Sequence, residues 1–148
     1  MTEQILIGSA LMIVTTLVHS GFTLMALEGL RTSRARGWLL HSAWARASLL
    51  AGLVLMMFLA SLVEVAIWAA TYLAEGAITG LEKALYFSMV TFTTLGYGDI
   101  VVGERWRLLA SLEAANGIIL FGWTTALIFA FIQHIVTNLQ RVKQGGDT

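Results

Sequence analysis

The sequence predicts an all-α membrane protein, because its apolar residues are too numerous for a soluble domain and fall into long runs. The chain has 148 residues, of which 57% are hydrophobic and 12% are charged. Soluble domains carry about 25% charged residues. A helix needs about 20 apolar residues to cross a bilayer. We therefore expect three transmembrane helices, one in each of the apolar runs at 5–27, 47–73 and 108–139.

The first run, 5–27, has the features of a transmembrane helix rather than of a secretory signal peptide. It is longer than the apolar core of a typical signal peptide. The charged residue before it is the acidic Glu3, where a signal peptide has basic residues. We expect residues 1–30 to form an N-terminal transmembrane helix.

Basic residues predict the orientation of the three spans. Arginines are concentrated in the segment 31–46, between the first two spans, and basic residues recur in the tail 141–148. The positive-inside rule places both segments in the cytoplasm, and the segment 74–107 outside. The arginines do not recur at every third residue of an apolar run, so they indicate topology and not a voltage sensor. Together with Trp38 and Trp44, they predict a cytoplasmic basic loop or an interfacial helix.

A shorter helix is predicted at 80–93, between the second and third spans. Thr79 and Glu82 have the spacing of a capping box, and the stretch from Leu81 to Thr94 contains neither Gly nor Pro. The helix is too short to cross a bilayer. Non-helical backbone at membrane depth is tolerated where protein encloses it or where it lines a water-filled path. A helix that leads into a glycine-rich segment therefore predicts a re-entrant pore loop.

The segment 94–99 reads Thr-Leu-Gly-Tyr-Gly-Asp and has glycine at alternate positions. Glycine adopts positive φ without a steric penalty, so Gly96 and Gly98 allow successive carbonyl groups to point to one side of the chain. Four copies around an axis would stack rings of carbonyl oxygens above a ring of Thr94 hydroxyls. Such rings replace the hydration shell of a monovalent cation, whereas Mg²⁺ gives up its water reluctantly.

This hexapeptide resembles the selectivity filter of potassium channels, T-x-G-Y-G-D, with Leu95 where valine or isoleucine is common. The similarity implies a pore domain at 47–140 of the small prokaryotic two-helix type, preceded by one extra N-terminal helix. Its implied parts are an outer helix at 47–73, a pore helix at 80–93, a filter at 94–99 and an inner helix at 108–139. The implied ion-binding residues of a homotetrameric filter are Thr94, Leu95, Gly96, Tyr97 and Gly98, with K⁺ held at the first four.

The resemblance also implies a hydrogen bond that supports the filter. In related channels an aromatic residue of the pore helix often bonds the aspartate behind the outer mouth, and the matching pair here is Tyr86 and Asp99. Packing of Tyr86 in an aromatic belt is the alternative. Some relatives add a pore-helix carboxylate near that aspartate, but Val90 occupies the matching position, so this partner is absent.

Two glycines of the third run, Gly117 and Gly122, fall where similar channels carry their inner-helix glycines. Gly117 is the candidate hinge, and close helix packing is the alternative for both glycines. A hydrophobic constriction near Phe129 is expected to close the path by dewetting. The same alignment predicts the residues that line the cavity and the gate on the inner helix, namely Ile118, Phe121, Thr125 and Phe129.

Ionisable residues inside the apolar runs need partners. A carboxylate in lipid must be neutral, paired or directed at protein. We expect Glu64 to face the pore helix or the inner helix and to brace the filter, with the indole N–H of Trp68 one turn later as a possible donor. A protonated core residue is the alternative. Glu113 is expected to act similarly or to lie near the outer interface, and His19 to be a buried or interfacial histidine rather than a pH sensor.

These features predict a channel that conducts K⁺ passively across a prokaryotic plasma membrane, with the N-terminus outside and the C-terminus in the cytoplasm. The expected partners are membrane lipids and three further copies of the chain. The sequence predicts no catalytic activity, no organic cofactor, no nucleic-acid binding and no ligand-binding domain. Three alternatives remain: a weakly selective monovalent cation channel, a non-conducting accessory subunit, and a transporter with half-helices at an ion site. A transporter of that kind would need repeated pore-loop segments, and this sequence has one.

Overall fold

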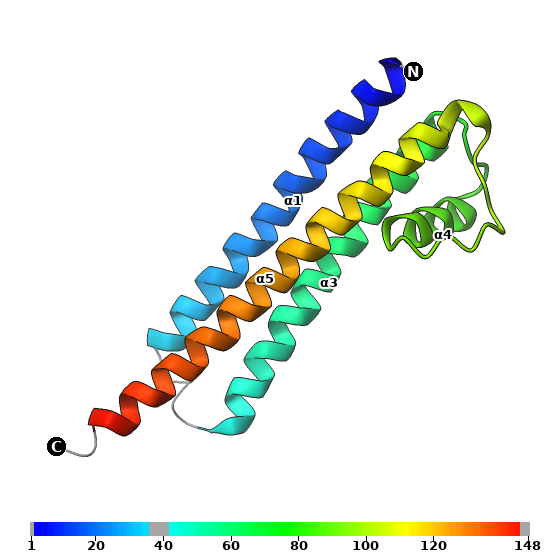
Figure 1. Cartoon of the computed structure of the whole chain (residues 1–148). Helices are drawn as coiled ribbons and strands as arrows, with labels where there is room; N and C mark the ends of the chain where they lie inside the picture. Colours follow the sequence, from blue (N-terminus) through cyan, green and yellow to red (C-terminus); the bar gives the residue numbers. More distant parts are fainter. Residues whose placement is uncertain (1, 36–41, 146–148) are drawn as a thin grey trace.

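The fold is a bundle of long helices (Figure 1), described here from a computed structural model that covers residues 2–35 and 42–145. Every regular element within those residues is helical, which confirms the prediction of an all-α fold. In chain order the elements are α1 (Thr2–Ala35), α3 (Ala43–Ala74), α4 (Leu81–Phe92), the 3₁₀ helix η1 (Glu104–Trp106) and α5 (Arg107–Gly145).

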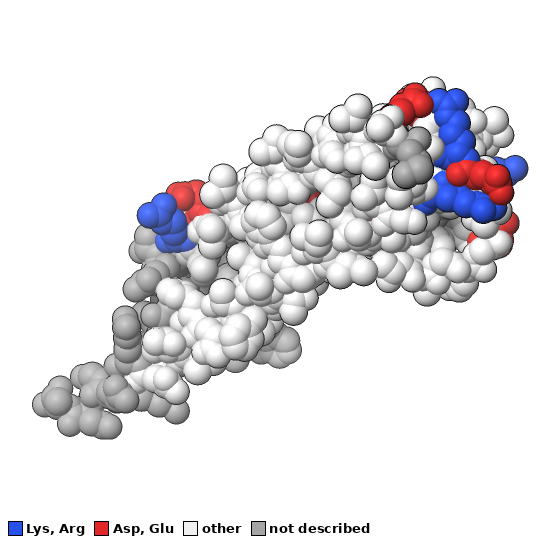
Figure 2. All heavy atoms as spheres, turned by 45° about the horizontal axis from the view of Figure 1, so that its top comes forward, with Lys and Arg blue, Asp and Glu red and all other residues white. Residues whose placement is uncertain are grey.

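Three of the helices are long and apolar enough to cross a membrane. The qualifying stretches have mean hydropathies of 1.8, 2.4 and 1.8 and lie at Thr2–Thr32, Ala43–Ala74 and Glu104–Thr137. Charged side chains gather at the two ends of the molecule, and the face shown in Figure 2 is almost free of them in between. This distribution fits a protein that lies across a bilayer, with its charges at the two aqueous surfaces.

Each long helix extends beyond the apolar run that predicted it. α1 continues to Ala35 and α3 begins at Ala43, so both ends of the basic segment 31–46 belong to the transmembrane helices. The basic loop or interfacial helix expected at 31–46 stays a prediction, and its centre around Trp38 lies outside the described residues. Helices propagate through polar residues once they are nucleated, which hydrophobicity alone does not reveal. Ser42 caps α3 by accepting a hydrogen bond from the backbone N–H of Ala45 at 3.1 Å.

The long helices α1, α3 and α5 lie side by side, and the short helix α4 packs against one end of α3 and α5 (Figure 1). The N-terminus lies at the end of the bundle that carries α4, and the C-terminal end of α5 lies at the opposite end. The chain that follows α4 returns to the same end before α5 begins. α4 therefore enters and leaves the bundle on one side, as a re-entrant element does.

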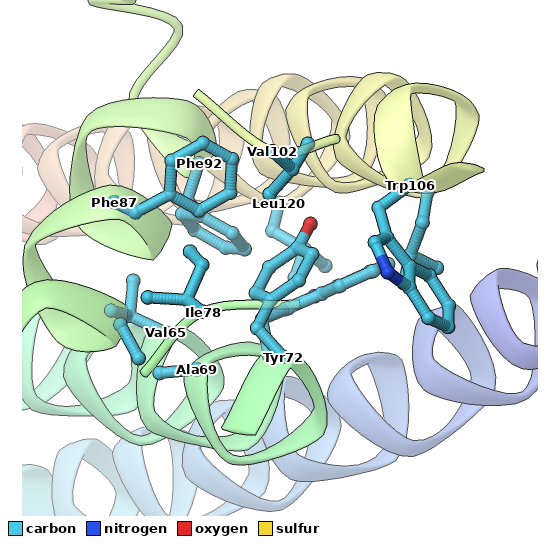
Figure 3. Close-up of a cluster of buried hydrophobic side chains, with 12 residues drawn as sticks. Val65, Ala69, Tyr72, Ile78, Phe87, Phe92, Val102, Trp106 and Leu120 are labelled. Atoms are coloured by element: carbon cyan, nitrogen blue, oxygen red, sulfur yellow. The ribbon is translucent and has the colours of Figure 1, made fainter. Parts of the chain in front are cut away.

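Buried apolar side chains from α3, α4 and α5 form the core that holds α4 in place (Figure 3). Tyr72 of α3 meets Phe87 of α4 edge to face, with ring centroids 5.1 Å apart, a preferred aromatic geometry. Phe92 and Leu120 are fully buried in the same cluster. The core therefore lies under the short helix and fixes where its C-terminal end points.

Polar contacts inside the bundle attach α1 to the other two long helices. His19 of α1 hydrogen-bonds Glu64 of α3 through Nδ1 at 2.9 Å, and its Nε2 lies 3.2 Å from the hydroxyl of Thr124 in α5. One turn earlier in α1, the hydroxyl of Thr15 accepts a hydrogen bond from the amide of Asn116 at 2.8 Å. His19, Glu64, Thr15 and Asn116 are buried, and a polar group in lipid needs such partners.

These contacts correct the expectation for Glu64. Its hydrogen-bond partner is His19 of α1 and not a residue of the pore helix. Trp68 does not donate to Glu64, because its indole N–H has no hydrogen-bond partner within the described residues. The sequence places Glu64 and Trp68 on one side of α3 but does not indicate which helix covers that side. Trp68 packs in the core under α4, while His19 is a buried and hydrogen-bonded histidine, as expected.

Candidate functional site

The candidate site begins with α4, which directs its C-terminal end toward the segment 94–99. The helix starts after Gly80, which has a φ of 97° and makes no side-chain cap, so the predicted capping box at Thr79 does not form. Glu82 still lies in the first turn, where a negative charge stabilises a helix. The helix ends at Phe92, and Thr93 is its C-cap. The partial negative charge of the helix end is thereby directed at the start of the candidate filter.

The backbone of the candidate filter alternates in handedness. Thr94, Gly96 and Gly98 have φ values of 60°, 55° and 77°. The positive φ predicted for the two glycines is confirmed. Thr94 also has positive φ, although a β-branched residue pays a steric penalty in this region. Alternation of this kind turns successive carbonyl groups toward the same side, which an extended strand does not do.

Hydrogen bonds to the last turn of α4 hold the first residues of the candidate filter. The carbonyl oxygen of Val90 accepts from the backbone N–H groups of Leu95 at 2.9 Å and of Gly96 at 3.2 Å, and the N–H of Thr94 donates to Thr91 at 2.9 Å. The end of a helix leaves carbonyl groups without intrahelical partners, and the filter uses them. The position of α4 therefore sets the position of the filter backbone.

Tyr86 and Asp99 form the predicted bond behind the filter. The Tyr86 hydroxyl donates to the Asp99 carboxylate at 2.7 Å, which confirms the expected contact. This hydrogen bond is the main cause of a pKa of Asp99 below its ordinary value, and it raises the pKa of Tyr86. Because a charge-assisted bond of this kind is stronger than a neutral one, it ties the outer end of the filter segment to the middle of α4.

A second set of contacts lies on the other side of α4 and was only partly foreseen. Glu113 of α5 is buried and hydrogen-bonds the hydroxyls of Ser88 in α4 and Tyr72 in α3, the latter at 2.7 Å. Ser88 also hydrogen-bonds the carbonyl oxygen of Val65 in α3 at 2.9 Å. The sequence signals a role for Glu113 only through its charge in an apolar run. Nothing in the sequence identifies Ser88 and Tyr72 as its partners.

The inner helix α5 approaches the end of α4 at Gly117. A Cβ atom on Gly117 would overlap the carbonyl oxygen of Phe92, whereas a Cβ on Gly122 would have no atom within 4 Å. Phe121 adds an edge-to-face contact with the ring of Phe92, at 5.5 Å between centroids. Close packing, the alternative left open for both glycines, therefore applies to Gly117 within one chain, and its role as a hinge stays a prediction.

The predicted cavity and gate residues lie along an uncovered face of α5. Ile118 and Phe129 are 61% and 62% exposed. Gly122 and Thr125 are also exposed, and the spacing of the four residues places them on one stripe of the helix. Phe121 is the exception, because it is half-buried against Phe92. Leu95 and Tyr97 of the candidate filter are 55% and 67% exposed, so a single chain leaves them uncovered as well.

Comparisons with known proteins agree with the geometry of this site. A protein family described as ion channel matches residues 57–134, which is more than half of the chain and includes α4, the candidate filter and most of α5. The chain is 42% identical over 66 residues to the voltage-gated potassium channel Kch of Escherichia coli, which covers 42% of this chain and 16% of that protein. No solved structure matches significantly.

A second curated relative is the calcium-gated potassium channel TvoK of Thermoplasma volcanium. It is 45% identical over 53 residues, which covers 35% of this chain and 15% of the relative. The chain therefore spans only a small part of the length of these curated relatives. The whole of α1 lies before the residues that the family matches.

Tyr86→Phe is expected to raise the pKa of Asp99 toward its ordinary value of 3.8, because the hydrogen bond that favours the ionised carboxylate is lost. In the wild-type protein the bond stabilises the fold above that value, and this stabilisation is lost as the pH falls through the lower pKa of the folded state. Carbon-13 NMR titration of the aspartate side chains measures this change in pKa. The chain has one other aspartate, Asp147, so two signals have to be assigned. Tyr72→Phe is the control, and an unchanged pKa of Asp99 in Tyr86→Phe would contradict this account.

Gly117→Ala is expected to lower the free energy of unfolding by about 1–3 kcal/mol, because the added methyl group overpacks α5 against the carbonyl of Phe92. Gly122→Ala is the matched control, since its methyl group meets no atom and alanine favours a helix by about 1 kcal/mol over glycine. Denaturation in mixed micelles measures both. Equal effects of the two substitutions would show that α5 does not approach α4 as described.

Proposed function

The chain belongs to the ion channel family, and from this membership we propose that four copies form a potassium-selective pore. Each copy contributes one segment 94–98 to a filter around a common axis. The alternation of φ at Thr94, Gly96 and Gly98 carries this proposal, because it turns the carbonyl groups to one side. Four such rows replace the water around a dehydrated K⁺ ion. The names of the two curated relatives, both potassium channels, support the choice of ion.

The uncovered surface of a single chain supports assembly. Leu95, Tyr97 and Val101 are each more than half exposed beside the filter. Large apolar side chains in one patch mark a surface that another protein or lipid covers. A filter cannot face lipid, because its carbonyl groups would have no partner there. We therefore place three neighbouring copies against this surface, with lipid around α1 and the outer side of α3.

The stripe on α5 lines the rest of the proposed path. Ile118, Thr125 and Phe129 would face a water-filled cavity, and Phe129 would form its narrowest point. A ring of phenyl groups excludes water when it is narrow, so it closes the path without a plug. In the proposed orientation, the N-terminus and the filter face outside and the C-terminal end of α5 lies in the cytoplasm, in accordance with the basic residues.

The proposal is tested with the purified protein in liposomes, where the efflux of K⁺ is compared with that of Na⁺ and native mass spectrometry gives the number of copies. We expect tetramers that pass K⁺ in preference. Gly98→Ala should reduce the K⁺ flux on the order of tenfold, because alanine is strained at a φ of 77° by about 1–3 kcal/mol. Gly29→Ala in α1, where no atom lies within 4 Å of the added Cβ, is the matched control.

Each other result of this experiment identifies an alternative. Equal fluxes of K⁺ and Na⁺ would replace the proposal with a weakly selective cation channel. Tetramers without any flux would replace it with a non-conducting accessory subunit. Monomers alone would exclude a filter made of four chains.

Phe129→Ala is expected to raise the basal K⁺ flux several-fold, because a smaller side chain widens and wets the constriction. Leu17→Ala in α1 is the control, since Leu17 is similarly exposed, at 66%, but does not belong to α5. Single-channel recording separates a higher open probability from a higher conductance. An unchanged flux in Phe129→Ala would exclude this residue as the constriction.

A further inference from the structure

Glu113 is a buried carboxyl group in a membrane span whose partners are two hydroxyl groups. One carboxyl oxygen accepts from the Tyr72 hydroxyl at 2.7 Å, and the other hydrogen-bonds Ser88. The three residues come from α5, α3 and α4, and all are buried. An ionisable side chain inside a membrane span is costly, and such residues commonly have a function. The number of donor hydrogens that these contacts require indicates the protonation state of Glu113.

The hydrogen bonds around Ser88 outnumber the hydroxyl hydrogens that can form them. The Ser88 oxygen hydrogen-bonds both the Val65 carbonyl oxygen and Glu113, but a serine hydroxyl has one hydrogen. The Tyr72 hydrogen is used on the other oxygen of Glu113. Three contacts therefore need three hydrogens, and the two hydroxyl groups supply two. A neutral carboxylic acid at Glu113 supplies the third.

We propose that Glu113 is a positioning residue for the filter, held as a neutral carboxylic acid that donates to Ser88 and accepts from Tyr72. Ser88 then donates its own hydrogen to the Val65 carbonyl oxygen. Every contact in the set has one donor and one acceptor, and no net charge is buried. A fully satisfied polar network fixes one arrangement of the helices that form it.

The network acts on the filter through α4. Ser88 precedes by two residues Val90, whose carbonyl oxygen receives the backbone N–H groups of Leu95 and Gly96. Glu113 and Tyr72 hold α4 from one side, while Tyr86 and Asp99 hold the outer part of the filter from the other. A shift of α4 therefore moves the filter carbonyl groups directly. This role rests on the proposed function, because it concerns the geometry of a K⁺ filter.

The test combines two substitutions at Glu113 with two measurements. Glu113→Gln keeps one acceptor and one donor in the same shape as the neutral acid, so it should keep the wild-type preference for K⁺ over Na⁺. Glu113→Leu removes both and should reduce that preference by about tenfold, because the site loses its hydrogen bonds while its volume is similar. Glu75→Gln, an exposed acid at the end of α3, is the control.

Infrared spectroscopy in heavy water tests the protonation state without any flux. The wild-type protein should show the carbonyl stretch of a buried neutral carboxylic acid, and Glu113→Gln should lack it while Glu75→Gln retains it. Absence of this band in the wild-type protein would overturn the neutral acid. Loss of selectivity in Glu113→Gln would do the same, because an amide cannot replace a carboxylate that needs two donors.

The outcomes separate this inference from the proposed function. If the wild-type protein does not prefer K⁺ over Na⁺, the proposed function is refuted, and with it a role for Glu113 in selectivity. The infrared band would still decide whether Glu113 is protonated. A selective wild-type channel in which Glu113→Leu folds and keeps full selectivity would refute only the positioning role. If Glu113→Leu does not fold, Ser88→Ala takes its place, because it removes the contact between Glu113 and α4 with a smaller change in side-chain volume. Unchanged selectivity in Ser88→Ala would then refute the positioning role.

Discussion

A backbone whose carbonyl groups all point to one side cannot form the hydrogen bonds of a β-sheet, and the rest of the structure depends on this constraint. In a sheet, carbonyl groups alternate and find partners on both sides. At 94–98 the alternation of φ removes that possibility, and the first N–H groups are taken by the carbonyl of Val90. Such a segment exists at membrane depth only when protein encloses it and something else satisfies its oxygens. The helix that precedes it must therefore be held more firmly than its length alone allows.

The means of holding α4 come from both neighbouring helices. An isolated helix of 12 residues is marginal in water, and α4 gains its stability from contacts with α3 and α5. Apolar side chains, among them Tyr72, Phe87 and Phe92, pack together under α4 (Figure 3). Polar contacts fix its rotation and depth, at Ser88 from one side and at Tyr86 from the other.

The sequence predicts the elements better than it predicts the contacts between them. Long apolar runs and alternate glycines are local signals, and they located the spans and the positive φ of Gly96 and Gly98. The partners of buried polar residues depend on how helices are rotated against one another. Glu64 was expected to face the pore helix or the inner helix, whereas its hydrogen-bond partner is His19 of α1 and Glu113 takes the place beside α4. The positive φ of Thr94 runs against the steric preference of a β-branched residue, so the residue type does not predict it.

The contacts of α1 have a consequence for how the subunit reaches the membrane. His19 and Glu64 are separated by 45 residues in the chain and share one hydrogen bond in the middle of the bundle. Until α3 has been synthesised, a nascent α1 would present an imidazole to hydrocarbon, and α3 would present a carboxyl group. Release of the two helices into lipid as a pair avoids both exposures. The hairpin of α1 and α3 is then the natural unit of biogenesis, completed when Thr124 and Asn116 arrive with the last helix.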